Sequence, residues 1–159
     1  MSTGSRHPVV VGAVVGGASG AIIAIDHLIW RRRVPLVVVA VCDEAAHVAT
    51  TLLLLAPFHQ RLPRRFLAGS LVGSVAIDID HLPMYAGVPL LTRRSARPVT
   101  HSLMTPAAAA LWAARGHGAG RPLAWGVTAG LVGHLLRDLT TGGVPLLWPW
   151  SSRTVRIGS

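Results

Sequence analysis

The chain has 159 residues, of which 51% are hydrophobic and only 13% are charged, and its mean hydropathy is +0.51. This composition is too apolar and too poor in charge for an ordinary soluble domain, so we expect a membrane protein. The net charge is +9, and all of the positive side chains other than histidine are arginines. The single cysteine, Cys42, excludes an internal disulfide framework or a cysteine-based zinc ribbon.

Five apolar segments, separated by short connections rich in Arg, Pro and Gly, are candidates for membrane helices. A helix needs about 20 residues to cross a hydrocarbon core of roughly 30 Å. In chain order the segments are 8–30, 35–58, 66 to about 83, 102–114 and 123–141. The fourth is short enough to be tilted, partial or re-entrant. We expect an all-α polytopic bundle of about five transmembrane or partly inserted helices, with residues 1–159 forming a single membrane-embedded domain.

Glycines recur at four-residue spacing in three of these segments. They are Gly12, Gly16 and Gly20, then Gly69 and Gly73, then Gly126 and Gly130. This spacing lets helix backbones approach closely, and it predicts close contacts of the first, third and fifth helices. The alternative interpretation is that glycine is simply common in membrane helices.

The acidic residues are placed unusually, because all of them lie inside or at the ends of apolar segments. They are Asp26, Asp43, Glu44, Asp78, Asp80 and Asp138. Histidines accompany them in Asp26-His27, Asp43-Glu44-x-x-His47, Asp78-x-Asp80-His81 and His134-x-x-x-Asp138, and His101 precedes the fourth segment. An ionisable group in a membrane segment is costly, so it is usually paired, bound to metal or exposed to a polar cavity.

Helical spacing and alternating helix direction predict that these groups converge. Residues three or four apart share a helix face, as in Asp43 and His47 or His134 and Asp138. If five helices alternate in direction, the ends that carry Asp78, Asp80, His81, His101 and Asp138 lie at one side of the membrane, with Asp43, His47 and His134 deeper. The sequence therefore predicts one site built from several segments.

Imidazole and carboxylate ligands suit a divalent cation, with zinc preferred and manganese or magnesium as alternatives. The candidate ligands are Asp78, Asp80, His81, His101, His134, Asp138, Asp43 and His47. Because there are more than four, the site could hold one or two ions. Two such ions can lower the pKa of a bridging water and neutralise charge on a phosphoryl oxygen, which is the chemistry of phosphoester hydrolysis.

Three stretches of the sequence resemble a known family. They are GSVAIDIDHLPMYAG (73–87), RPVTHSLM (97–104) and GLVGHLLRDLTTGGVPLLWPW (130–150). Together they are similar to the inner-membrane-associated metal-dependent hydrolases, a family also described as LexA-binding and YdjM-like. The resemblance covers about half of the chain, and it implies a small polytopic membrane protein with hydrolase activity. It places Asp78, Asp80, His81, His101, His134 and Asp138 at the metal and catalytic positions of the family.

The chain departs from this family pattern at two places. Ile77 stands where the family commonly has proline, and Ala96-Arg97-Pro98 stands where it often has His-Arg-Gly. Asp43, Glu44 and His47 are candidates to replace the missing histidine.

The function expected from these features is membrane-embedded hydrolysis of a phosphoester or other ester by a metal-activated water, on an anionic lipid or a lipid-linked substrate. Asp80 or Glu44 is the candidate general base, and Arg137 is a candidate catalytic contact to phosphate. Arg97, Arg94 and Ser102 are candidates for substrate binding, and Ser102 has the alternative role of capping the fourth helix.

Partners and alternatives follow from the same residues. We expect a multi-pass protein of the inner membrane whose partner is the lipid bilayer. We expect no nucleic-acid partner, because the arginines form short clusters between apolar stretches. One alternative is a cation or proton transporter with a relay through Asp43, Glu44 and His47. The other is a non-catalytic membrane adaptor with a structural metal.

Overall fold

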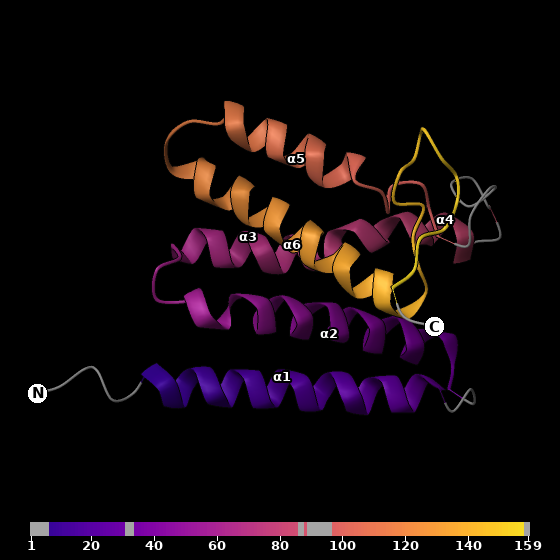
Figure 1. The fold of residues 1–159 in the computed structure, drawn as a ribbon, viewed down its shortest axis with the longest axis horizontal. Helices are drawn as coiled ribbons and strands as arrows, with labels where there is room; N and C mark the ends of the chain where they lie inside the picture. Colours follow the sequence, from indigo (N-terminus) through magenta and orange to yellow (C-terminus); the bar gives the residue numbers. More distant parts are fainter. Residues whose placement is uncertain (1–6, 31–33, 86–87, 89–96, 158–159) are drawn as a thin grey trace, which may run out of the picture. The chain divides into compact units, whose positions relative to one another are not determined.

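A computed structural model describes residues 7–30, 34–85, 88 and 97–157, and its contacts divide the chain into two compact units (Figure 1). The N-terminal unit is Met1–Leu62 and the C-terminal unit is Pro63–Ser159, and each is described by itself. The helices are α1 (His7–Trp30), α2 (Leu36–Leu55), η2 (Ala56–Phe58), α3 (Arg64–Val75), η3 (Ala76–His81), α4 (Leu82–Tyr85), α5 (Met104–Arg115), η4 (Gly118–Gly120) and α6 (Arg121–Thr141). Extended structure in the described residues is limited to one antiparallel bridge, so the predicted all-α class is confirmed.

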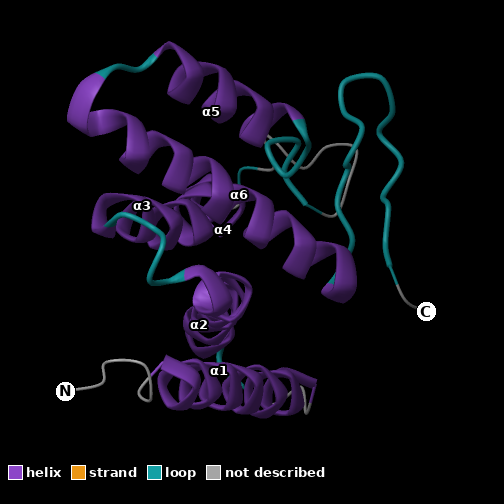
Figure 2. Cartoon of the chain, turned by 60° about the vertical axis from the view of Figure 1, so that its left-hand side comes forward, coloured by secondary structure: helices purple, strands orange, loops and turns teal. Residues whose placement is uncertain are grey.

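The N-terminal unit consists of the two long apolar helices α1 and α2, which pack against each other (Figures 1 and 2). Pro35 begins α2 as its N-cap residue, where its fixed φ of −54° suits a helix start. Pro8–Ile29 and Leu36–Phe58 are long and apolar enough to cross a membrane. At 1.5 Å per residue each covers slightly more than the hydrocarbon thickness of about 30 Å.

The remaining helices do not meet the same test, so for them the expectation of transmembrane or partly inserted helices stays a prediction. Within the described residues only two helices are candidate spans. The helices α3 and α5 have 12 residues each, about 18 Å of helix, which is well short of a hydrocarbon core. The 21-residue α6 is long enough, but it carries His134, Arg137 and Asp138. The single membrane-embedded domain stays a prediction.

Glycine packing organises the C-terminal unit, in which α6 lies between α3 and α5 and contacts both. A Cβ atom added at Gly69 or Gly73 of α3 would overlap the backbone of α6, at Leu123 and Val127 respectively. The converse holds on α6, where added Cβ atoms at Gly126 and Gly130 would overlap the backbone of α3. The predicted close contact of the third and fifth segments is therefore confirmed.

The same spacing in α1 gives a different result. A Cβ atom added at Gly12, Gly16 or Gly20 would meet no atom within 4 Å among the described residues. The structure therefore shows no close helix contact at these three glycines, and the prediction for the first helix is not confirmed.

The third predicted segment is broken where the acidic residues begin. The α-helix ends at Val75, and the chain continues as the tighter 3₁₀ helix η3 before the short α4. In a 3₁₀ helix, residues three apart lie directly above one another. Asp78 and His81 therefore point to the same side of η3.

After α6 the chain forms a hairpin, residues 143–157, which we call the C-terminal hairpin (Figure 2). It starts at Gly143, whose φ of +77° is in the region that favours glycine and whose added Cβ would crowd Thr154 and Val155. Val144 and Val155 exchange backbone hydrogen bonds of 2.9 and 2.8 Å. Val144 is fully buried with Leu135 and Leu139 of α6, which fixes the base of the hairpin to that helix.

Candidate metal site

Three segments of the C-terminal unit bring three carboxylates and three imidazoles together, a group that we call the acid–histidine cluster. Its members are Asp78, Asp80 and His81 of η3, His101 of the turn before α5, and His134 and Asp138 of α6. The close packing of α3 on α6 places η3 beside the last turns of α6. The predicted convergence of these six residues is therefore present in the structure.

His101 connects the three segments of the cluster. Its Nε2 lies 3.0 Å from Asp78 Oδ1 and 3.5 Å from Asp138 Oδ2, and its Nδ1 lies 3.4 Å from Asp80 Oδ2. The side chain is fully buried. An imidazole that faces a carboxylate from each side is held in one orientation, which is what a ligand needs for a defined site.

The spacing of the donor atoms suits a single small cation. His81 Nδ1 lies 3.2 Å from Asp78 Oδ1 and 3.0 Å from Asp80 Oδ1. One donor atom from each of Asp78, Asp80, His81 and His101 lies within 4.8 Å of all the others. Nitrogen and oxygen ligands bind zinc at about 2.0–2.2 Å, so the donors of one ion are at most about 4.4 Å apart. The four side chains come close to this spacing without a backbone change.

His134 is held so that one of its ring nitrogens faces the cluster. Its Nδ1 lies 2.8 Å from the carbonyl oxygen of Ser74. A carbonyl oxygen only accepts, so Nδ1 carries the hydrogen, and in the neutral ring Nε2 presents a lone pair. That Nε2 faces Asp138 Oδ2 at 3.2 Å and His101 Nε2 at 3.2 Å. A backbone carbonyl that fixes the tautomer in this way is the usual support of a metal-binding histidine.

The cluster carries an excess of negative charge. Arg97 pairs with Asp138, with Nη2 2.8 Å from Oδ1, and this is the arginine that the sequence assigned to substrate binding. Three carboxylates and one guanidinium leave a net charge of −2 before any histidine is protonated. One divalent cation neutralises this charge, and so do two protons on the histidines. A buried group of this kind requires one or the other.

Protons are the competing occupants in the absence of metal. Burial alone would raise the pKa of Asp78 and Asp80, but hydrogen bonds from His101 and His81 outweigh it and hold both pKa values well below their usual range. Burial alone would lower the pKa of His81, but its hydrogen bonds to Asp78 and Asp80 outweigh this effect and raise the pKa to about 9. The pKa of His101 is raised in the same way. A cation that binds here must displace protons.

The predicted residues Asp43, Glu44 and His47 lie on α2 of the N-terminal unit. Asp43 Oδ2 is 3.9 Å from His47 Nε2, as the four-residue spacing predicts. Because the two units are described separately, their membership of the site stays a prediction.

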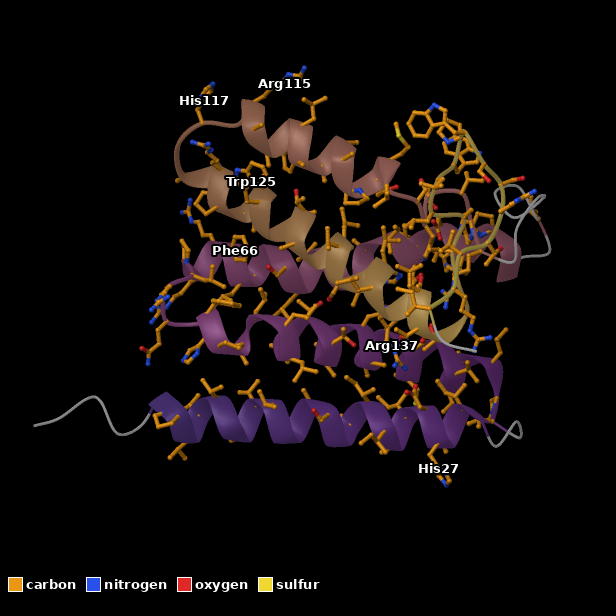
Figure 3. All side chains as sticks on the ribbon, in the orientation of Figure 1. His27, Phe66, Arg115, His117, Trp125 and Arg137 are labelled. Carbon is orange, nitrogen blue, oxygen red and sulfur yellow. The ribbon has the colours of Figure 1, made fainter. Side chains whose placement is uncertain are left out.

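The predicted substrate-binding and catalytic residues have varied surroundings. Arg137 lies in the last turns of α6 and is only 7% exposed (Figure 3). Ser102 is fully buried, and it does not cap the fourth helix, since the N-cap residue of α5 is Leu103. Arg94 lies outside the described residues.

Two supporting contacts were not predicted from the sequence. The hydroxyl of Thr100 donates to Asp80 Oδ2 and so orients that carboxylate. The backbone carbonyl of Ser74 orients His134. The position of Thr100 beside His101 in the Thr-His-Ser motif is a signal that could have identified it, whereas a carbonyl group leaves no mark in the sequence.

Comparison with known proteins identifies one family. The model of the family described as YdjM inner membrane protein matches residues 43–159, which is more than half of the chain and includes the whole acid–histidine cluster. No curated protein matches significantly. No solved structure matches either.

Proposed function

Since the chain belongs to the YdjM inner membrane protein family, we propose that it is a metal-dependent hydrolase of the inner membrane whose acid–histidine cluster binds a divalent cation, zinc in the first place. The observation that carries the proposal is the buried His134 Nε2. Its lone pair faces carboxylate and imidazole donors from two other segments. Manganese and magnesium are the alternative ions.

The cluster divides into ligands and supporting groups. Asp78, His81 and His101 share one group of donor atoms with Asp80, and His134 Nε2 lies 3.6 Å from Asp78 Oδ1 and 3.2 Å from His101 Nε2. Asp78, His81, His101 and His134 are the proposed ligands, with Asp138 beside them. Arg97 holds Asp138 through its other oxygen, so that Oδ2 stays directed at the cluster.

Asp80 is the proposed general base. Its Oδ2 is fixed by the hydroxyl of Thr100, while Oδ1 faces His81. When bound, the cation would supply a water of lowered pKa and would neutralise charge that develops on the substrate oxygen. Asp80 would accept a proton from that water, and the bond to Thr100 keeps the carboxylate from rotating away.

The proposed substrate class is a phosphoester or other ester of a lipid or lipid-linked compound. Two observations support it: the chain belongs to an inner membrane family, and two helices of the N-terminal unit are long and apolar enough to span a bilayer. A multi-pass arrangement is part of the proposal. Arg137, next to Asp138 on α6, is the candidate contact for a phosphate group.

The experiment is metal analysis and turnover measured on the same detergent-purified full chain. We expect stoichiometric metal and hydrolysis of soluble phosphomonoester, phosphodiester or carboxyl-ester probes. His134→Gln should lose the metal and the turnover, and Asp80→Asn should lose turnover while most of the metal stays. His117→Gln, at the far end of α5 in Figure 3, is the matched control and should change neither.

The alternatives give different results in the same assay. A chain that holds metal but turns over no probe, and whose ligand variants only melt at lower temperature, would be an adaptor with a structural metal. A chain that binds no metal after reconstitution would contradict the proposal.

A further inference from the structure

The tip of the C-terminal hairpin carries exposed apolar side chains that the proposed function does not use. They are Leu147 (49%), Trp148 (36%) and Trp150 (79%). A single exposed apolar residue is ordinary, but a cluster with two tryptophans marks a surface that contacts something else.

The returning half of the hairpin is cationic. Arg153 and Arg156 are exposed, and the sequence from 139 to 159 contains no Asp or Glu. The preceding acid, Asp138, is buried and paired with Arg97. The hairpin therefore combines two exposed tryptophans with two exposed arginines.

The base of the hairpin is hydrogen-bonded to the chain beside two members of the acid–histidine cluster. The amide of Leu103 donates to the carbonyl of Leu146 at 3.0 Å, two residues after His101. The amide of Ile157 donates to the carbonyl of Leu139 at 2.7 Å, one residue after Asp138. In Figure 2 the hairpin extends away from the helices beyond the end of α6. A surface held in place in this way loses little conformational entropy when it binds.

We propose that this tip docks on the surface of a bilayer that contains anionic phospholipid. Trp148 and Trp150 would lie at the membrane–water interface, where tryptophan is enriched. Arg153 and Arg156 would contact headgroup phosphates. Each cationic side chain near an anionic leaflet adds to the attraction between protein and membrane. A second copy of the chain fits this surface less well, because a two-fold contact would bring the arginines of both copies together.

The docking would hold the acid–histidine cluster at the level of the lipid headgroups, since the hairpin is bonded beside both His101 and Asp138. Docking of the hairpin tip does not require a bound metal, so it can be tested from the environment of the tip alone.

The test uses the full chain in vesicles with Trp150 as its one fluorophore, after Trp30, Trp112, Trp125 and Trp148 are changed to phenylalanine. In vesicles of phosphatidylcholine with phosphatidylglycerol, we expect blue-shifted emission, strong quenching by lipids brominated near the headgroup, and protection from aqueous acrylamide. An Arg153→Gln/Arg156→Gln variant should shift back toward the emission of exposed tryptophan, and so should vesicles of phosphatidylcholine alone. Circular dichroism checks that each variant keeps its helices.

Three results would overturn the proposal. The first is water-exposed emission in every lipid. The second is equal quenching in both lipids and in the arginine variant, which would remove the role of anionic headgroups. The third is protection from acrylamide that increases with the protein-to-lipid ratio while brominated lipid does not quench the emission. This result would show that a second copy of the chain covers the tip.

Discussion

The two units of this chain use similar sequence patterns for different purposes. The N-terminal unit has the two helices that are long and apolar enough to cross a membrane, and a Cβ added at Gly12, Gly16 or Gly20 of α1 would meet no described atom within 4 Å. In the C-terminal unit the glycines bring α3 and α6 into backbone contact. In that unit the acidic and histidine side chains of three segments meet. Glycine spacing therefore indicates where helices can pack closely. The acid–histidine cluster lies beside the pair of helices that do so.

The largest effect expected in this comparison follows from removing Asp138, because Arg97 would then lose its partner. Loss of one member of a buried ion pair typically costs about 3–5 kcal/mol, and here the value should lie at the lower end because Arg97 is partly exposed. Asp138→Ala should lower the melting temperature measured by circular dichroism in detergent. The double variant Arg97→Gln/Asp138→Asn should recover part of the loss. Equal stability of the single variant and the wild type would contradict the pairing.

The glycine contrast predicts the next largest effect. Gly130→Ala places a Cβ against Ser70 and Ser74 of α3, so one helix must shift, at a cost of about 1–3 kcal/mol. Gly16→Ala meets nothing in α1, and it should be neutral or stabilising by up to about 1 kcal/mol through helix propensity. Melting curves of the two variants compare them directly. The reverse order would show that α1 makes the closer contact.

A smaller effect is expected from Thr100, which supports Asp80 without belonging to the cluster. Thr100→Val keeps the shape and removes the hydroxyl that donates to Asp80 Oδ2. Loss of such a supporting bond typically costs about 10- to 100-fold in metal affinity or activity. Thr100→Ser should retain the function. The metal affinity is measured by competition with a chelator. Equal metal affinity of Thr100→Val and the wild type would show that Thr100 does not support the metal site.

The mildest perturbation is pH, which tests the competition between protons and metal. The pKa of His81 is raised from 6.5 to about 9, so its contribution to the stability of the metal-free protein is complete below pH 6.5 and is lost as the pH rises through about 9. Metal affinity should change oppositely and rise between pH 6.5 and 9, by about tenfold per pH unit for each displaced proton. Chelator competition at several pH values measures it. A flat profile would mean that His81 is not a ligand.

Much of the fold is visible in the sequence, because apolar length and Pro or Gly breaks decide where α1, α2, α5 and α6 begin and end. The acidic residues Asp78 and Asp80 indicate in the sequence that the third helix ends near them, but nothing there predicts that the chain continues as the 3₁₀ helix η3. The C-terminal hairpin was not predicted. Among the described residues it is paired through a single bridge, Val144 with Val155, which is too short to give an alternating strand pattern in the sequence.

The six members of the acid–histidine cluster could be predicted because ionisable groups are rare and costly in such an apolar chain. The role of Arg97 could not be predicted. The sequence shows a positive charge near the Thr-His-Ser motif, and only the folded chain shows that this charge pairs with Asp138.

X-ray absorption at the metal edge of the purified full chain measures whether the acid–histidine cluster holds a divalent cation. We expect a bound metal with only nitrogen and oxygen neighbours at about 2.0–2.2 Å, including histidine, and we expect His101→Ala to lose it. Sulfur at about 2.3 Å would instead place the metal at Cys42, and a metal-free protein that resists reconstitution would show that the cluster holds no cation.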